Sequence, residues 1–82
     1  MPRFHFHTQD GSCSVDREGL DLPDIEAARE EAAKSLGDVL RDTPGLFLEH
    51  DNLQIIVTDD NDLTLFSFDL STTKAPALAG RR

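Results

Sequence analysis

The sequence predicts an α+β fold: a two-layer ββαββ sandwich in which one helix packs on a four-stranded, mostly antiparallel sheet. Residues 3–9 and 53–70 alternate apolar and polar side chains with the period of a strand. Between them, residues 25–40 carry apolar side chains at helical spacing. A chain of 82 residues suits a single domain, which we assign to residues 1–70. Residues 71–82 show no periodicity and are expected to form a disordered basic tail.

The first hairpin is predicted from strand alternation and a turn dipeptide. One face of residues 3–9 holds Phe4, Phe6 and Thr8, and the other holds His5, His7 and Gln9. The Asp10-Gly11 dipeptide that follows favours a two-residue type I′ turn. That turn would pair Gln9 with Ser12, Thr8 with Cys13, His7 with Ser14, Phe6 with Val15 and His5 with Asp16. Leu20 and Leu22 then continue the strand with inward-facing side chains.

The helix is predicted over residues 24–43. Its apolar stripe consists of Ile25, Ala28, Ala32, Leu36, Val39 and Leu40. Pro23 is expected to open the helix, with Asp21 or Asp24 as the cap, and the Thr43-Pro44-Gly45 tripeptide ends it. Residues 46–52 fit either a short helical turn or an apolar flap under the helix end.

The second hairpin is predicted with Asn61 and Asp62 in its turn. This register pairs Val57 with Phe66, Ile55 with Phe68 and Leu53 with Leu70. A turn at Asp60-Asn61 would instead pair Val57 with Thr64. We favour the first register because asparagine tolerates a positive φ at the leading turn position.

These three periodicities meet in one layer and define the predicted core. It comprises Phe4, Phe6, Val15, Ile25, Ala28, Ala32, Leu36, Val39, Leu53, Ile55, Val57, Phe66, Phe68 and Leu70.

Charge narrows the classes of partner. The chain has a net charge of −8, and residues 1–70 carry 16 acidic and 5 basic residues, a net charge of −11. The last twelve residues hold the other three basic residues and no acidic one. Such a surface repels phosphate, so we expect no direct binding of nucleic acid. We also expect no membrane contact, since no apolar run or signal peptide is present, and a cytoplasmic location, since there is one cysteine.

The two histidines near the start raise the question of a metal site. His5 and His7 share a strand face, and Asp16 lies opposite His5 in the predicted register, so these three residues are the candidate metal ligands. The simpler interpretation is an ordinary strand, in which inward Phe4 and Phe6 turn the histidines outward. We favour that interpretation, and expect both histidines to titrate near the ordinary pKa and His5 to pair with Asp16 across the strands.

Other candidate chemistry is weaker. Cys13 faces Thr8 in the predicted register, and a thiol buried there would be inert. The acidic run at residues 59–62 lacks the glycine and glutamate that a calcium loop needs at its later positions. We therefore predict no catalytic residue, no cofactor and no resident metal.

The chain resembles a family of small uncharacterised proteins, common in alphaproteobacteria, that is known only as a domain of unknown function. The matching residues are Met1, Pro2, Arg3, Phe4, Phe6, His7, Asp10, Gly11, Gly19, Leu22, Pro23, Asp24, Ala27, Ala28 and Arg29, followed by the acidic "VTDDNDLTLF" hairpin. The similarity covers residues 1–70 and departs at His5, where an aromatic is usual, and at Asp62, where glycine would suit the turn better. It implies the fold class and a bacterial cytoplasmic setting, and it brings no activity.

Taken together, these features favour a non-enzymatic protein-interaction or regulatory module with an unknown protein partner. The alternative is a divalent-metal-binding protein that uses His5 and His7. A third hypothesis is acidic mimicry of nucleic acid toward a basic protein. We also expect a homodimer, with its contact at the first hairpin, the helix flank or residues 46–50, because a symmetric contact at the acidic turn would repel itself.

Overall fold

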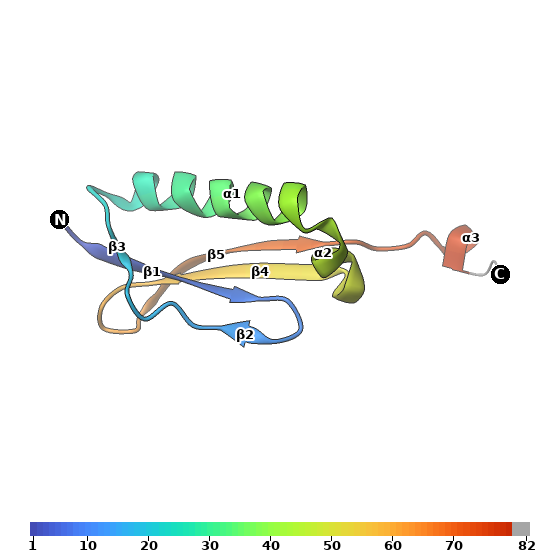
Figure 1. Cartoon of the computed structure of the whole chain (residues 1–82), viewed down its shortest axis with the longest axis horizontal. Coiled ribbons are helices and arrows are strands. Elements are labelled where there is room, and N and C mark those ends of the chain that lie inside the picture. Colours follow the sequence, from blue (N-terminus) through green and yellow to red (C-terminus); the bar gives the residue numbers. More distant parts are fainter. Residues whose placement is uncertain (80–82) are drawn as a thin grey trace.

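A computed structural model describes residues 1–79 and confirms the α+β fold. Its elements in chain order are β1 (Arg3–Gln9), β2 (Cys13–Ser14), β3 (Leu20–Asp21), α1 (Ile25–Asp42), α2 (Pro44–His50), β4 (Asn52–Thr58), β5 (Thr64–Ser71) and α3 (Pro76–Ala79). Helix α1 lies over one face of the sheet (Figure 1). Within the described chain, no helix is both long and apolar enough to cross a membrane.

The sheet has five strands rather than the predicted four, in the order β2-β1-β4-β5, with β3 also pairing with β1. The two hairpins join through β1 and β4, which run antiparallel with Phe6 opposite Val57. The segment after β2 returns along β1, so that β3 pairs with the start of β1 through Arg3–Asp21 and Phe4–Leu20. One edge of the sheet is therefore built from two short pieces, and the other is the continuous strand β5.

The predicted register of the first hairpin is wrong by one residue. Gln9 lies opposite Cys13 and Thr8 opposite Ser14, so the turn has three residues rather than two. A type I′ turn needs a positive φ at both Asp10 and Gly11, but only Gly11 has one, at +102°. A positive φ costs glycine little and other residues more, which favours the wider turn. As a result Cys13 is exposed rather than buried.

The predicted register of the second hairpin is confirmed. Val57 lies opposite Phe66, Ile55 opposite Phe68 and Leu53 opposite Leu70. The turn differs in detail, because the positive φ falls at Asp62 (+68°) and not at Asn61. An irregularity between Val57 and Thr58 then absorbs one extra residue on β5.

Helix α1 begins and ends within one residue of the prediction. Asp24 is the N-cap and accepts a hydrogen bond from the backbone N–H of Ala27 at 2.9 Å. Pro23 therefore precedes the cap instead of opening the helix. After Thr43, residues 44–50 form helix α2, the first of the two alternatives that the sequence left open.

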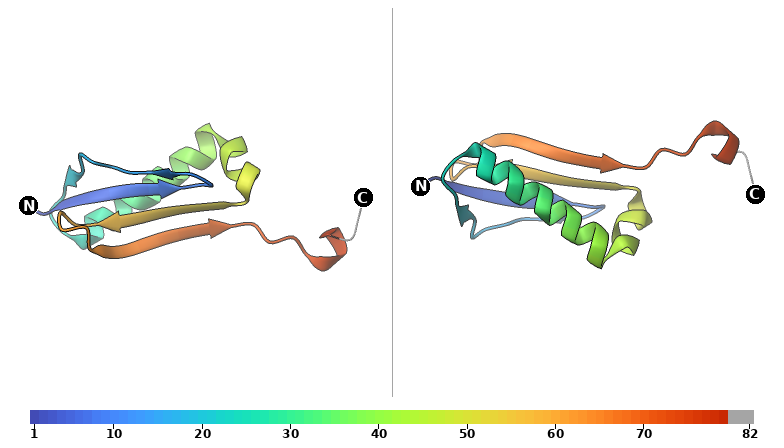
Figure 2. Two further views of the ribbon diagram at one scale, coloured as in Figure 1. Left: turned by 90° about the horizontal axis from the view of Figure 1, so that it is seen from below. Right: turned by 90° about the horizontal axis from the view of Figure 1, so that it is seen from above.

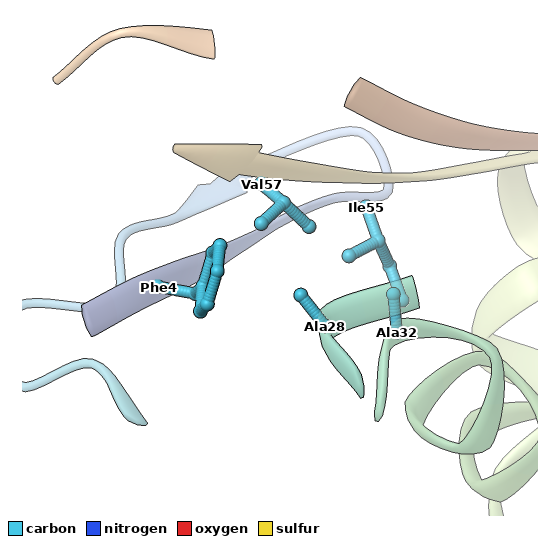
Figure 3. Packing of buried hydrophobic residues seen from close by; sticks show 5 residues of the cluster. All are labelled: Phe4, Ala28, Ala32, Ile55 and Val57. Atoms are coloured by element: carbon cyan, nitrogen blue, oxygen red, sulfur yellow. The ribbon is translucent and has the colours of Figure 1, made fainter. Parts of the chain in front are cut away.

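The core lies between α1 and the centre of the sheet. Its buried cluster consists of Phe4, Ala28, Ala32, Ile55 and Val57 (Figure 3), and Leu53 and Phe47 are buried as well. The two alanines let the helix approach the strands closely. Of the remaining predicted core residues, Phe6, Leu36, Val39, Phe66, Phe68 and Leu70 are half-buried.

Two predicted core residues are wrong, and one was missed. Val15 is 56% exposed, because the chain leaves the sheet after β2 ends at Ser14. Ile25 is 42% exposed, since it is the first residue of α1 and lies at the end of the layer. Phe47 of α2 is 7% exposed and closes the opposite end of the core.

Beyond β5 the chain runs away from the sheet (Figure 1). Thr72 still donates a backbone hydrogen bond to Asp51 at 3.1 Å, and residues 76–79 form the one-turn helix α3, which the sequence did not predict. The rest of the predicted disordered tail, residues 80–82, lies outside the described residues.

Candidate functional site

The predicted site residues gather on the sheet face opposite α1, where the segment between β2 and β3 lies against β1. This segment, residues 15–19, leaves a gap in the ladder beside β1. Asp16 fills the gap with its carboxylate. Its Oδ2 accepts from the backbone N–H of Phe6 at 3.1 Å, and its Oδ1 accepts from those of Glu18 at 3.2 Å and Gly19 at 3.1 Å. The Asp16 carboxylate thus takes the place of the backbone carbonyl that a neighbouring strand would offer to β1 at this position.

The Asp16 carboxyl is held in its charged form. Partial burial acts to raise its pKa, but the hydrogen bonds from Gly19, Phe6 and Glu18 and the nearby His5 outweigh that effect. Its pKa therefore lies below the ordinary value of 3.8. Because all three bonds come from backbone groups, the predicted His5–Asp16 side-chain pair is absent and the carboxylate serves the loop instead.

His5 links this loop to the second hairpin. Its Nδ1 lies 3.1 Å from the backbone carbonyl oxygen of Asp16, and its Nε2 lies 2.8 Å from Oδ1 of Asp60. Both partners accept, so only the doubly protonated ring satisfies both bonds. The hydrogen bond to Asp60 raises the pKa of His5 above 6.5, although burial opposes the change and the Asp16 carbonyl supports it. The expectation of an ordinary pKa was wrong for His5.

The ring nitrogens of His7 have different hydrogen-bond roles from those of His5. Its Nδ1 accepts from the backbone N–H of Asp16 at 3.1 Å, and its Nε2 lies 3.0 Å from the hydroxyl of Thr58, a buried residue. An Nδ1 that accepts carries no proton, so Nε2 holds the proton and donates to the hydroxyl. The rings of His5 and His7 are parallel within 5°, with centroids 6.3 Å apart. The hydrogen bonds of His5 thus suit a doubly protonated ring, and those of His7 suit a ring that is protonated at Nε2 alone.

An open hollow of about 320 Å³ lies beside these rings. Its lining residues are His5, His7, Val15, Asp16, Arg17, Asp59, Asp60 and Asp62. Most of its polar side chains are already hydrogen-bonded within the protein. Asp59, for example, accepts from the backbone N–H of Asn61 at 2.8 Å and of Leu63 at 3.0 Å. The acidic groups that remain open to a partner are Asp60, whose side chain is 64% exposed, and the exposed Asp62.

The three candidate metal ligands, His5, His7 and Asp16, all line this hollow. All four ring nitrogens of His5 and His7, and both carboxylate oxygens of Asp16, have hydrogen-bond partners in the structure. Over residues 1–79, no three side chains of histidine, cysteine, aspartate or glutamate are arranged to hold a metal ion. Cys13 is exposed and pairs with Gln9, outside the hollow.

Sequence reasoning missed Asp60 and Thr58 as partners of the histidines. Both residues lie more than 50 positions from the histidine they contact. The pairing of β1 with β4 places Thr58 opposite His5, and the turn after β4 then brings the Asp60 carboxylate within hydrogen-bond distance of Nε2 of His5. No local pattern signals this arrangement, because it depends on the order of strands in the sheet.

The second surface of interest is the free edge of β5. This strand has eight residues and pairs only with β4 in the described part of the chain. Helix α1 crosses the sheet diagonally, from the β5 side at its start to the β2 side at its end, and leaves the later part of β5 uncovered (Figure 2). Phe66 and Phe68 face the helix layer but remain half-buried, with ring centroids 5.7 Å apart.

These features define a small acidic α+β domain with one interrupted sheet edge and one continuous edge. A family model described as "Domain of unknown function (DUF6894)" matches residues 3–71, and the chain belongs to that family. The comparisons with curated proteins and with solved structures returned no match.

Proposed function

We propose that this domain is a non-enzymatic protein-interaction module that binds an extended partner segment at the open edge of β5. The observation that supports the proposal is that the β5 edge is continuous over eight residues, whereas the opposite edge consists of the two short strands β2 and β3. The strand is long and continuous, no strand among the described residues lies beside its outward backbone groups, and it carries the half-buried Phe66 and Phe68. Addition of a strand to such an edge is a common mode of peptide recognition.

Charge favours a partner with basic residues near the start of β5. The turn that precedes the strand holds Asp59, Asp60 and Asp62, and the body of the protein carries a net charge of −11. Such a surface attracts a basic segment and speeds its association, and the effect weakens as salt is added. Mimicry of nucleic acid toward a basic protein would depend on the same negative surface charge. The single cysteine suits a reducing compartment, and we place the function in the cytoplasm.

Site-specific photo-crosslinking in cells that express the protein tests the proposal. A photoreactive residue at Ser67, exposed on β5, is compared with one at Ser14, exposed on the short strand β2. We expect protein adducts from position 67 and few from position 14. Adducts from position 14 alone, or from neither position, would overturn the proposal.

The alternative function, binding of a divalent metal by His5 and His7, has the parallel, neighbouring rings in its favour. A metal ion would have to displace the bonds that the rings make with Asp16, Asp60 and Thr58. Zinc titration followed by calorimetry separates the two functions. We expect wild-type protein to bind zinc no more tightly than a His7→Ala variant does. A sub-micromolar affinity that disappears in that variant would favour the metal function.

A further inference from the structure

We propose that the partner of the β5 edge is a second copy of this chain, paired antiparallel through β5 so that Lys74 of each copy lies beside the acidic β4–β5 turn of the other. This inference rests on the proposed function, since it names the partner of the same edge. It differs from the contact that the sequence favoured, at the first hairpin, the helix flank or residues 46–50.

The charge distribution along β5 makes the strand complementary to itself. The acidic turn, Asp59 to Asp62, comes directly before the strand, and a stretch with three basic residues and no acidic one follows it. Antiparallel pairing brings the end of each strand to the start of the other. Lys74, the basic residue of that stretch within the described chain, therefore comes near the acidic turn of the other copy, and opposite charges lie together at both ends of the pair.

The same geometry keeps like charges apart. Strands rise about 3.4 Å per residue, so two acidic turns at opposite ends of an eight-residue ladder are separated by roughly 25 Å. That exceeds the screening length of about 8–10 Å at moderate salt. The repulsion that argued against a contact near the turn therefore does not apply to this arrangement.

The side chains of β5 fit either of the two central registers. A two-fold axis at Ser67 places Phe66 opposite Phe68 of the second copy, and Lys74 then lies beyond the ladder at the end where the β4–β5 turn of the second copy lies. An axis at Phe68 places Phe66 opposite Leu70 of the second copy and leaves Lys74 at the same end of the ladder. In both registers the half-buried aromatic side chains share the helix-covered face, and Asp69 meets an uncharged residue.

The uncovered part of β5 also matches this arrangement. Because α1 starts on the β5 side of the sheet and crosses away from it, the later part of β5 lacks a covering layer (Figure 2). In an antiparallel pair, the start of the second copy's α1 comes to that end. Ile25, which opens α1, is 42% exposed and supplies apolar surface there.

Sedimentation equilibrium of the full-length chain tests the inference, using wild type and two variants. Ser67→Asp places a carboxylate opposite the same carboxylate of the second copy in the first register and opposite its Asp69 in the second, and Ser14→Asp makes the matched change on the opposite edge. Both serines are exposed, so neither change disturbs the core. We expect wild type to form a dimer, Ser67→Asp to dissociate it, and Ser14→Asp to leave it intact. The reverse pattern would place the contact at the first hairpin and overturn the inference.

A charge reversal tests the role of the ends. Lys74→Glu and Asp62→Lys should each weaken the dimer by about threefold to tenfold at low salt, as expected for two exposed ion pairs. The double variant should recover the wild-type affinity, and all differences should shrink in high salt. Equal dimerisation of wild type and Lys74→Glu would overturn the end contact.

The two proposals fail in distinguishable ways. A wild-type chain that stays monomeric up to its solubility limit would overturn the second copy as partner. If position 67 still cross-links to another protein in cells, the interaction function of β5 stands. If position 67 forms no adduct, both proposals fail together.

Discussion

The two edges of the sheet differ in how far they leave backbone groups available for pairing with another strand. The β2/β3 edge is two short pieces joined by residues 15–19, and the gap is closed by the Asp16 carboxylate and the two histidines. The β5 edge is one continuous strand of eight residues with no covering element in the described chain. Interruption, turns and charge protect one edge against pairing, whereas the other keeps its backbone groups available.

The two edges also differ in how their polar side chains are hydrogen-bonded. Asp16, His5, His7 and Thr58 are used within the protein, and they hold the interrupted edge in place. The side chains of β5 make no such bonds among the described residues. The cluster of His5, His7 and Asp16 is thus bonded within the protein, whereas our proposals place binding at the plainer strand β5.

The largest expected effect compares an aromatic side chain from each region. Phe4 on β1 is 4% exposed, so Phe4→Ala should lower the free energy of unfolding by about 4 kcal/mol. Phe68 on β5 is half-buried, and Phe68→Ala should cost about 2 kcal/mol. Urea denaturation in dilute protein measures both. Equal losses would mean that the β5 side is as well covered as the β1 side.

The next effect tests the protected edge itself. Asp16→Ala leaves the backbone N–H groups of Phe6, Glu18 and Gly19 without their acceptor, and should cost about 3 kcal/mol. Asp69→Ala is the matched control on β5, where the change should stay within about 0.5 kcal/mol. Amide hydrogen exchange of Phe6 should also quicken in Asp16→Ala. A stability loss as small as that of the control would contradict the role of Asp16.

The pH dependence of stability tests the link between the two hairpins. Because the pKa of His5 is raised in the fold, its contribution is complete below pH 6.5 and is lost as the pH rises through the folded value. Because the pKa of Asp16 is lowered, its contribution is present above pH 3.8 and is lost as the pH falls through the folded value. The unfolding temperature should therefore decline when the pH is raised from 6 to 8.

Asp60→Asn should flatten that decline, since it removes the carboxylate that raises the pKa of His5. Asp62→Asn is the matched control: it alters a neighbouring acidic residue in the same turn and should leave the slope unchanged. Thermal unfolding at a series of pH values measures both. A wild-type slope in Asp60→Asn would show that His5 does not carry the pH dependence.

The smallest effect concerns the turn that opens the β5 edge. Asp62 has a φ of +68°, a conformation that glycine adopts without steric cost. Asp62→Gly should raise the free energy of unfolding by about 0.5 kcal/mol, and Asp62→Ala should lower it. Chemical denaturation of the two variants checks the sign. A loss of stability in Asp62→Gly would mean that the carboxylate stabilises the turn more than the backbone strains it.

Much of the fold followed from local patterns. The bounds of α1 and the pairing of β4 with β5 were predicted because the helical stripe of residues 25–40 and the alternation of residues 53–70 each admit few arrangements. The first hairpin was less determined. A two-residue and a three-residue turn at Asp10-Gly11 differ little in energy, yet they move Cys13 from one face to the other.

The sequence by itself determined the α+β class, the helix, the second hairpin and the outward direction of both histidines, since each depends on the spacing of neighbouring residues. Only the tertiary structure decided which strands are central, that Asp60 contacts His5, and that β5 is the free edge. The physical reason is that strand order depends on contacts between segments far apart in the chain. Those contacts leave no periodic trace in either segment, so they are decided by how the hairpins pack together beneath α1.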